Sequence, residues 1–147
     1  MNGGVILGTI DGANAEIDEE IGSENVFLFG AHAKEVPVLR AARRAFKPCI
    51  EFTRVLGMLK SGYFGNTDIF VPLAEALEGD QDFYLLANDF PQYLAAQAEV
   101  DRAYVDRDRW TRMSILNTAG SGKFSSDRTI REYAEDIWGI EPCVRPM

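Results

Sequence analysis

A glycine-rich stretch near the end of the chain, residues 120–127 (GSGKFSSD), is the first candidate for chemistry because Gly-Lys pairs occur in loops that bind nucleotide phosphates. Such a loop needs the pattern G-x-x-x-x-G-K-[ST] between a strand and a helix. If Gly122 began the Gly-Lys pair, the first glycine would fall on Asn117, and the required hydroxyl residue would be Phe124. Residues 110–118 also have a helical pattern. The sequence therefore argues against a nucleotide loop.

The same stretch fits a break between two helices. Gly120 and Gly122 could end one helix and turn the chain, because glycine reaches positive φ without steric cost. The serines and aspartate that follow are common N-cap residues, and Thr129 with Glu132 has the spacing of a capping box. A helix ending at Gly139 would place these apolar residues on one face: Ile130, Tyr133, Ala134, Ile137 and Trp138. We interpret the stretch as a hinge and a helix cap.

Composition and charge exclude several classes of function. The 147 residues are 46% hydrophobic, enough for the core of one domain. The net charge of −8 and the lack of a basic cluster argue against nucleic acid and anionic membranes as partners. Cys49 and Cys143 show no pairing pattern, fit a reducing compartment and exclude a cysteine-based zinc site. His32, the single histidine, is expected at a helix start or on the surface.

The first thirty residues have the pattern of a strand–helix–strand unit. Residues 5–10 (VILGTI) form a continuous apolar run, which is typical of a strand buried on both faces. The turn DGAN follows and can open a helix over residues 13–21. Residues 26–30 (VFLFG) then form a second strand. Such a unit occurs in parallel sheets.

The remainder is mostly helical in pattern. We expect helices over residues 35–46, from Phe52 to about Gly62, from a cap at Asp68 to Leu77, from Pro91 to Tyr104 and over residues 107–118, with a short strand at residues 83–86. Two strands do not complete a doubly wound sheet, and the first has the composition of a central strand. We therefore expect the chain to be the C-terminal part of a longer protein whose earlier strands complete the sheet.

Four stretches together resemble the C-terminal end of the glycogen or α-glucan phosphorylases, and most closely the plant and algal form. They occur in the family's order and cover nearly the whole chain, with a looser match over residues 31–92: NGGVILGTIDGANAEI, ENVFLFG, WTRMSILNTAGSGKFSSDRTI and YAEDIWGIEP. The resemblance implies an α/β fold with the glycosyltransferase-B (GT-B) architecture, in which the active site lies between two Rossmann-like domains. Residues 1–118 would be the C-terminal portion of the second Rossmann-like domain. Residues 119–147 would be a hinge and a crossover helix that packs toward the N-terminal domain.

The resemblance also implies an activity. Phosphorylases use inorganic phosphate to release glucose 1-phosphate from an α-1,4-glucan, with pyridoxal phosphate held by a lysine as a Schiff base. The family places that lysine in a G-T-G-N-M-K motif just before the residues matched by Asn2 and Gly3, so it is absent here. The four lysines of the chain match no part of the motif: Lys34, Lys47, Lys60 and Lys123. The resemblance thus implies an enzyme in the complete protein, with phosphate, glucan and the remainder of the chain as partners.

From the same resemblance we expect the complete protein to be a homodimer in the cytoplasm or a plastid. We expect no catalytic residue and no activity in this segment alone. Asn2 and Gly3 are candidates for shaping the cofactor pocket. The best candidates for facing the active-site cleft follow the first strand, because ligands of open α/β sheets bind beyond the carboxyl ends of the strands. They are Thr9, Asp11, Gly12 and Asn14. The alternative is that Asp11 and Asn14 only cap the turn and the helix.

Other interpretations stay open at this level. Lys123, Arg128 and Arg131 are expected in ion pairs rather than as phosphate ligands, and Trp110 and Trp138 in the core. The chain could be an inactive fragment, or a non-catalytic half that pairs with a partner chain. It could also be a Rossmann-like binding or interaction module without catalysis, although no G-x-G-x-x-G follows either strand.

Overall fold

The computed structural model of the chain describes residues 3–141 and 143, and it is a mixed α/β structure that is mostly helical, with a small parallel sheet. The elements are β1 (Leu7–Thr9), α1 (Gly12–Ile21), β2 (Phe27–Phe29), α2 (Val36–Ala42), α3 (Ile50–Lys60), α4 (Thr67–Glu75), α5 (Leu86–Val105), α6 (Arg107–Gly120) and α7 (Ser126–Glu132). A 3₁₀ turn, η4 (Ser121–Phe124), joins α6 to α7, and a π-helical segment, η5 (Tyr133–Trp138), continues α7.

The two predicted strands pair in parallel, which confirms the strand–helix–strand unit. Leu7 lies opposite Phe27 and Thr9 lies opposite Phe29. The connection between parallel strands must cross from one end of the sheet to the other, and α1 makes that crossing.

Helices cover both faces of this small sheet, as the apolar pattern predicted. Because successive side chains of a strand point to opposite faces, β1, β2 and the residues before them contribute to two separate clusters. On the α1 face the cluster contains Ile17, Ile21 and Val26, with Ile6, Leu28 and Phe124 packed against it. On the face of α5 and α6 it contains Phe27, Ala103 and Met113, with Val5, Leu7, Val100 and Trp110 packed against it.

The strands themselves are less buried than predicted. Of their six residues only Phe27 is buried, and the other five are half-buried. The physical reason is that each strand has one neighbour within the described part of the chain, so one edge of each strand has no partner strand.

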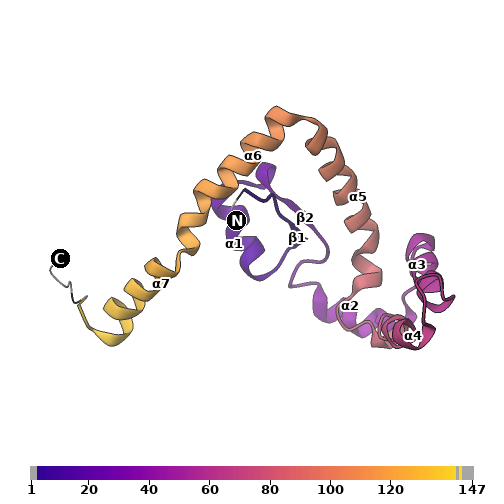
Figure 1. Ribbon diagram of the computed structural model, residues 1–147. Coiled ribbons are helices and arrows are strands. Elements are labelled where there is room, and N and C mark those ends of the chain that lie inside the picture. The colour runs from indigo at the N-terminus through magenta and orange to yellow at the C-terminus, as the bar shows by residue number, and fades with distance from the viewer. Residues whose placement is uncertain (1–2, 142, 144–147) are drawn as a thin grey trace.

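The long helices α5 and α6 form an arch over the sheet. Figure 1 shows that they meet at the top of the view, with β1, β2 and α1 between their lower ends. The arch separates two outlying parts: α2, α3 and α4 lie at the foot of α5, and α7 extends beyond the foot of α6. A third apolar cluster joins α3 and α4 to the start of α5, and it contains Phe52, Leu56, Ala74 and Ala87. No helix in the part of the chain that the structure describes is long and apolar enough to cross a membrane.

A buried asparagine ties α6 to the start of β2. The side chain of Asn117 is fully buried, and its Nδ2 donates hydrogen bonds to the backbone oxygens of Asn25 (2.8 Å) and Met113 (2.9 Å). Asn25 is itself buried and donates to the backbone oxygen of Ile21 (2.7 Å). This chain of hydrogen bonds connects α6, β2 and the end of α1.

Three predicted boundaries around α4 and α5 are wrong. Residues 83–86 are not a strand, because Asp82 accepts hydrogen bonds from the backbone N–H groups of Leu86 and Ala87 (both 2.8 Å) and starts α5 there. Pro91 consequently lies inside α5 instead of opening it. The N-cap of α4 is Asn66, whose side chain accepts from the backbone N–H of Asp68, so Asp68 is not the cap.

The predicted hinge is also wrong in its mechanism. Gly120 has helical dihedrals (φ −67°, ψ −15°) and closes α6, and Gly122 lies within the helical turn η4, so neither uses positive φ. Thr129 does not form a capping box, because it lies inside α7 and its hydroxyl donates to the backbone oxygen of Ser125 (3.3 Å). The end at Gly139 is confirmed: it has φ 62° and donates its N–H to the oxygen of Ala134.

The buried asparagine gives a stability prediction. Asn117→Asp keeps the shape of the side chain but replaces the Nδ2 donor with an oxygen that faces two carbonyl oxygens. An unpaired buried charge of this kind should lower the free energy of unfolding by about 3–5 kcal/mol. Thr111→Asp, which adds the same charge on the exposed side of the same helix, should change it by less than about 0.5 kcal/mol. Urea unfolding of both variants checks this, and equal midpoints would contradict it.

Candidate functional site

A large cavity lies where the predicted cleft-facing residues were expected, at the carboxyl ends of the two strands. It has a volume of about 680 Å³. The strand ends contribute Thr9, Asp11 and Phe29 to its wall, and α2, α3 and α5 close the other sides. Open α/β sheets bind their ligands at this end of the strands, and a large apolar cavity with a few polar groups is the usual form of a ligand site.

The turn after β1 is held by its own side chains. The hydroxyl of Thr9 donates to Asp11 Oδ1 (2.9 Å), and Asn14 Nδ2 donates to the backbone oxygen of Thr9 (2.9 Å). Gly8 leaves the space that Asn14 needs, since a Cβ at Gly8 would lie 2.5 Å from Asn14 Nδ2. Asp11 occupies the N-cap position of α1, but its side chain makes no capping hydrogen bond.

These contacts separate the four candidates into two pairs. Thr9 and Asp11 line the cavity, whereas Gly12 and Asn14 are not among its lining residues. Asn14 instead fixes the backbone of the turn that presents the first two. The direct contact of Thr9 or Asp11 with a ligand stays a prediction.

The exit from β2 is held by α5. The backbone N–H of Gly30 donates to Gln92 Oε1 (2.9 Å), and that of Ala31 donates to Asp89 Oδ1 (3.2 Å). Gly30 has φ 90°, and a Cβ there would approach Asp89 Oδ2 to 2.8 Å, so glycine is required for this close approach. The roles of Asp89 and Gln92 were not predicted from the sequence, although their spacing of three residues within a helical pattern placed them on one face.

Aromatic rings form much of the cavity wall. Phe29 and Tyr93 pack edge to face with ring centroids 5.4 Å apart, and Phe90 lies 6.0 Å from Tyr93 and 5.1 Å from Phe52. The wall is therefore mainly apolar.

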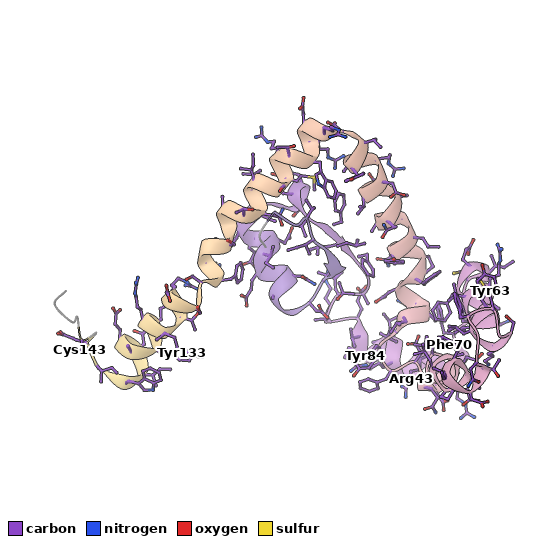
Figure 2. All side chains as sticks on the ribbon, in the orientation of Figure 1. Arg43, Tyr63, Phe70, Tyr84, Tyr133 and Cys143 are labelled. Atoms are coloured by element: carbon purple, nitrogen blue, oxygen red, sulfur yellow. The ribbon has the colours of Figure 1, made fainter. Side chains whose placement is uncertain are left out.

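The loop before α5 covers one side of the cavity in a strained conformation. Leu85 is buried and has φ 62°, a left-handed conformation that is rare for a bulky residue. The carboxylate of Asp82 holds the loop at the start of α5, and Arg40 of α2 donates to the backbone oxygen of Phe83 (3.0 Å) while its guanidinium stacks over the Phe83 ring at 4.0 Å. Tyr84 is exposed at the lower edge of the molecule in Figure 2 and also lines the cavity.

The cavity does not fit a pyridoxal phosphate bound as a Schiff base, because none of the four lysines of the chain lines it. His32 is exposed, as expected, and is not a lining residue either. Among residues 3–141 and 143, no group of three or more His, Cys, Asp or Glu side chains could hold a metal ion. The cavity residues can shape and line a binding surface, and its wall includes the hydrogen-bonded pair of the Thr9 hydroxyl and the Asp11 carboxylate.

The remaining predicted residues lie elsewhere. Gly3 is at the amino end of β1, where its N–H donates to Thr118 Oγ1 (3.1 Å) and its carbonyl accepts from Ser114 Oγ (2.8 Å); Asn2 falls outside the described residues. Trp110 packs against the core as predicted, whereas Trp138 was predicted wrongly, since it is exposed on η5.

Ion pairs were predicted for Lys123, Arg128 and Arg131. The structure confirms them for Lys123 and Arg128. Lys123 Nζ lies 2.6 Å from Glu20 Oε1, and the hydrogen bond to this carboxylate raises the pKa of the Lys123 ammonium. Arg128 Nη1 lies 2.6 Å from Glu132 Oε1. A lysine held by a carboxylate within a 3₁₀ turn is unlike the phosphate-binding lysine of a nucleotide loop.

Comparison with known proteins agrees with these features. The family model described as carbohydrate phosphorylase matches residues 1–140. The chain is 54% identical to the α-glucan phosphorylase H isozyme of Solanum tuberosum and to the cytosolic α-glucan phosphorylase 2 of Arabidopsis thaliana, in each case over 99% of this chain and 18% of that protein. It is also 54% identical to the chloroplastic/amyloplastic α-1,4 glucan phosphorylase L isozyme of Vicia faba, over 97% of this chain and 15% of that protein.

The chain thus spans about 18% of the length of the first curated relatives it matches. The family model, in contrast, covers nearly all of this chain. A parallel strand–helix–strand unit with a cavity at its carboxyl end accompanies that match. The chain belongs to the carbohydrate phosphorylase family.

Proposed function

We propose that this chain is the C-terminal segment of a pyridoxal-phosphate-dependent α-1,4-glucan phosphorylase, which uses inorganic phosphate to release glucose 1-phosphate from a glucan. The observation that carries the proposal is the 54% identity to plant α-glucan phosphorylases over 99% of the chain. Bound pyridoxal phosphate would supply the proton-transferring phosphate group of the reaction. Its lysine would lie outside this chain, so the segment would be inactive alone.

The fold supports a place for the segment within the complete enzyme. Residues 1–118 would complete the second Rossmann-like domain of a GT-B architecture, and residues 119–147 would connect back to the N-terminal domain. The support is the parallel β1–α1–β2 unit with helices on both faces, which is the building unit of such domains. The edges of β1 and β2 that have no partner within the described residues leave room for further strands.

Within the complete enzyme, Thr9 and Asp11 would face the cleft between the two domains. Their support is their place in the cavity wall at the carboxyl ends of the strands. A threonine hydroxyl and a carboxylate can each form hydrogen bonds with sugar hydroxyls. Asn14 would keep the turn in shape, and Asn2 and Gly3 would flank the cofactor pocket from the other end of β1.

The tail, which consists of α7 and η5, would dock on the N-terminal domain. The support is that its apolar residues Ile130, Tyr133 and Ile137 are 55%, 46% and 65% exposed, which leaves their surface available to other protein. Burying three such side chains is worth several kcal/mol in total, on the order of 1.5–3 kcal/mol each. A complete enzyme would also form the homodimer that the family resemblance implies. The relatives include cytosolic and chloroplastic/amyloplastic proteins, and the chain would belong to one of these two compartments.

Fragment complementation tests the proposal. Coexpressing the chain with the preceding part of the Solanum tuberosum relative should restore phosphorolysis of soluble starch, whereas each piece alone should be inactive. Ile137→Asp should prevent this, because it places a charge in the docking face, and Ile137→Leu should not. Glucose 1-phosphate formation is the measurement. Correctly associated pieces that release no glucose 1-phosphate would contradict the proposed function.

A second prediction concerns Thr9 and Asp11 in the complemented enzyme. If they contact the ligand, Thr9→Val and Asp11→Asn should lower kcat/KM about tenfold or more, because each removes a polar interaction worth about 1.4 kcal/mol or more. The thermal unfolding midpoint of Asp11→Asn should stay close to that of the parent, because an asparagine Oδ1 can still accept from the Thr9 hydroxyl, whereas Thr9→Val should lower the midpoint slightly by removing that hydrogen bond. Asn14→Ala, which disturbs only the turn, should instead lower the midpoint, and Glu16→Gln on the exposed side of α1 should change neither.

The competing interpretation gives the opposite result. If Asp11 served only to hold the turn, Asp11→Asn would lower the unfolding midpoint and leave the kcat/KM of the folded enzyme unchanged.

A further inference from the structure

The connection between α6 and α7 contacts α1 at three successive positions. Gly120 lies so close to α1 that a Cβ there would be 2.4 Å from Ile21 Cγ2. Phe124 packs against the buried cluster that contains Ile21. Between them, Lys123 forms its ion pair with Glu20. The connection is therefore docked along the last turn of α1.

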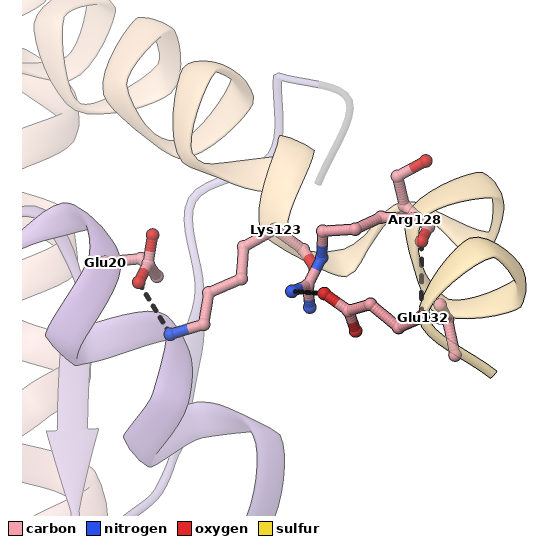
Figure 3. A network of polar contacts seen from close by, with 6 residues as sticks. Glu20, Lys123, Arg128 and Glu132 are labelled. Carbon is pink, nitrogen blue, oxygen red and sulfur yellow. Dashed lines mark hydrogen bonds and ion pairs between the residues drawn. The ribbon is translucent and has the colours of Figure 1, made fainter. Parts of the chain in front are cut away.

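Lys123 links this docked segment to the tail. Its side chain reaches Glu20 of α1, and its backbone oxygen accepts a hydrogen bond from Nε of Arg128 in α7 (2.7 Å). Arg128 is held in turn by Glu132, one turn further along α7. Figure 3 shows this line of contacts, in which Lys123 stands between α1 and α7.

The backbone of the connection also leaves little freedom. Gly120 and Ser121 have helical dihedrals, and η4 continues the helical path to Phe124. The chain leaves the helical region at Ser125, whose ψ is 129°, and its N–H donates to the oxygen of Gly122 (3.2 Å). A loose hinge would lack these contacts.

We propose that residues 120–125, together with Glu20 and Arg128, form a locked elbow that fixes the direction of α7 relative to α1. Gly120 is a positioning residue of this elbow, since only a residue without a side chain allows α6 to approach Ile21 so closely. Lys123 is the second positioning residue, because it bonds to both helices. The elbow presents the exposed apolar face of the tail in one direction before that face meets other protein.

Preorganisation of this kind lowers the entropic cost of docking. That consequence rests on the proposed function, in which the tail docks on the N-terminal domain. The elbow itself does not, because its contacts lie within this chain and can be measured without any enzymatic assay.

Acidic residues of α1 surround the Lys123 ammonium, so a change of charge at position 123 should weaken its attachment to α1. The carboxylates of Glu16 and Glu19, besides that of Glu20, act on the ammonium and contribute to its raised pKa. A glutamate at position 123 would therefore face three carboxylates of α1 and should be repelled from it.

Pulsed electron spin resonance can measure the direction of the tail. Spin labels at Ala13→Cys in α1 and Arg131→Cys in α7, with Cys49 and Cys143 both changed to alanine, report the distance between the two helices. The elbow predicts a single narrow distance distribution for the 147-residue chain. A broad distribution in this parent would overturn the proposal.

Two glycine variants provide the first comparison. Gly120→Ala should shift or broaden the distribution, because its Cβ displaces α6 from Ile21. Gly122→Ala is the matched control, since a Cβ there would have no heavy atom within 4 Å and Gly122 has no positive φ; the distribution should stay that of the parent. Identical distributions for both variants and the parent would contradict the role of Gly120.

A charge reversal provides a second comparison that does not alter packing. Lys123→Glu should broaden the distribution, and adding Glu20→Lys should restore it in part by rebuilding the pair in the opposite sense. Glu132→Gln with Lys123 intact removes only the ion-pair partner of Arg128 in α7. It should therefore broaden the distance distribution less than Lys123→Glu does. If Lys123→Glu left the distribution narrow and unshifted, the tail would be positioned by something other than the elbow.

Discussion

The parallel pairing of β1 with β2 is the constraint on which the other elements depend. It requires a connection that crosses the sheet, which α1 supplies, and it sends alternate side chains to two faces that must both be covered. Cluster residues of α1 cover one face, and those of α5 and α6 cover the other. The buried side chain of Asn117 then joins α6 to the start of β2, so the arch and the sheet hold each other in place.

The cavity follows from the same pairing. Parallel strands end at the same side of the sheet, so the turn after β1 and the exit from β2 lie next to each other there. Asn14 fixes the first, and Asp89 and Gln92 of α5 fix the second. The cavity contributes a shaped surface with polar side chains that include Thr9 and Asp11 at the strand ends. The chemistry that we propose for the complete enzyme also requires residues outside this chain.

The sequence predicted elements with strong patterns and missed those set by single side chains. The strand in the apolar run 5–10 and the helix α6 were predicted correctly because many residues contribute to each pattern, although the strand is less buried than predicted. The start of α5 was misjudged because one buried carboxylate, Asp82, overrides Pro91 as a helix signal. Gly120 was predicted to turn the chain as part of a hinge. Its actual role depends on Ile21, which leaves no room for a side chain at position 120, and a sequence pattern does not reveal a contact between residues so far apart in the chain.

If this chain is one part of a longer phosphorylase, as we propose, other parts of that protein cover the apolar face of α7 and the open edge of β1. Hydrogen exchange followed by mass spectrometry can compare the chain alone with the chain bound to the preceding part of a plant relative. We expect slower exchange in α7, η5 and β1 on binding, with α6 beside Asn117 unchanged. Equal exchange of α7 and η5 in the free and the bound chain would contradict it.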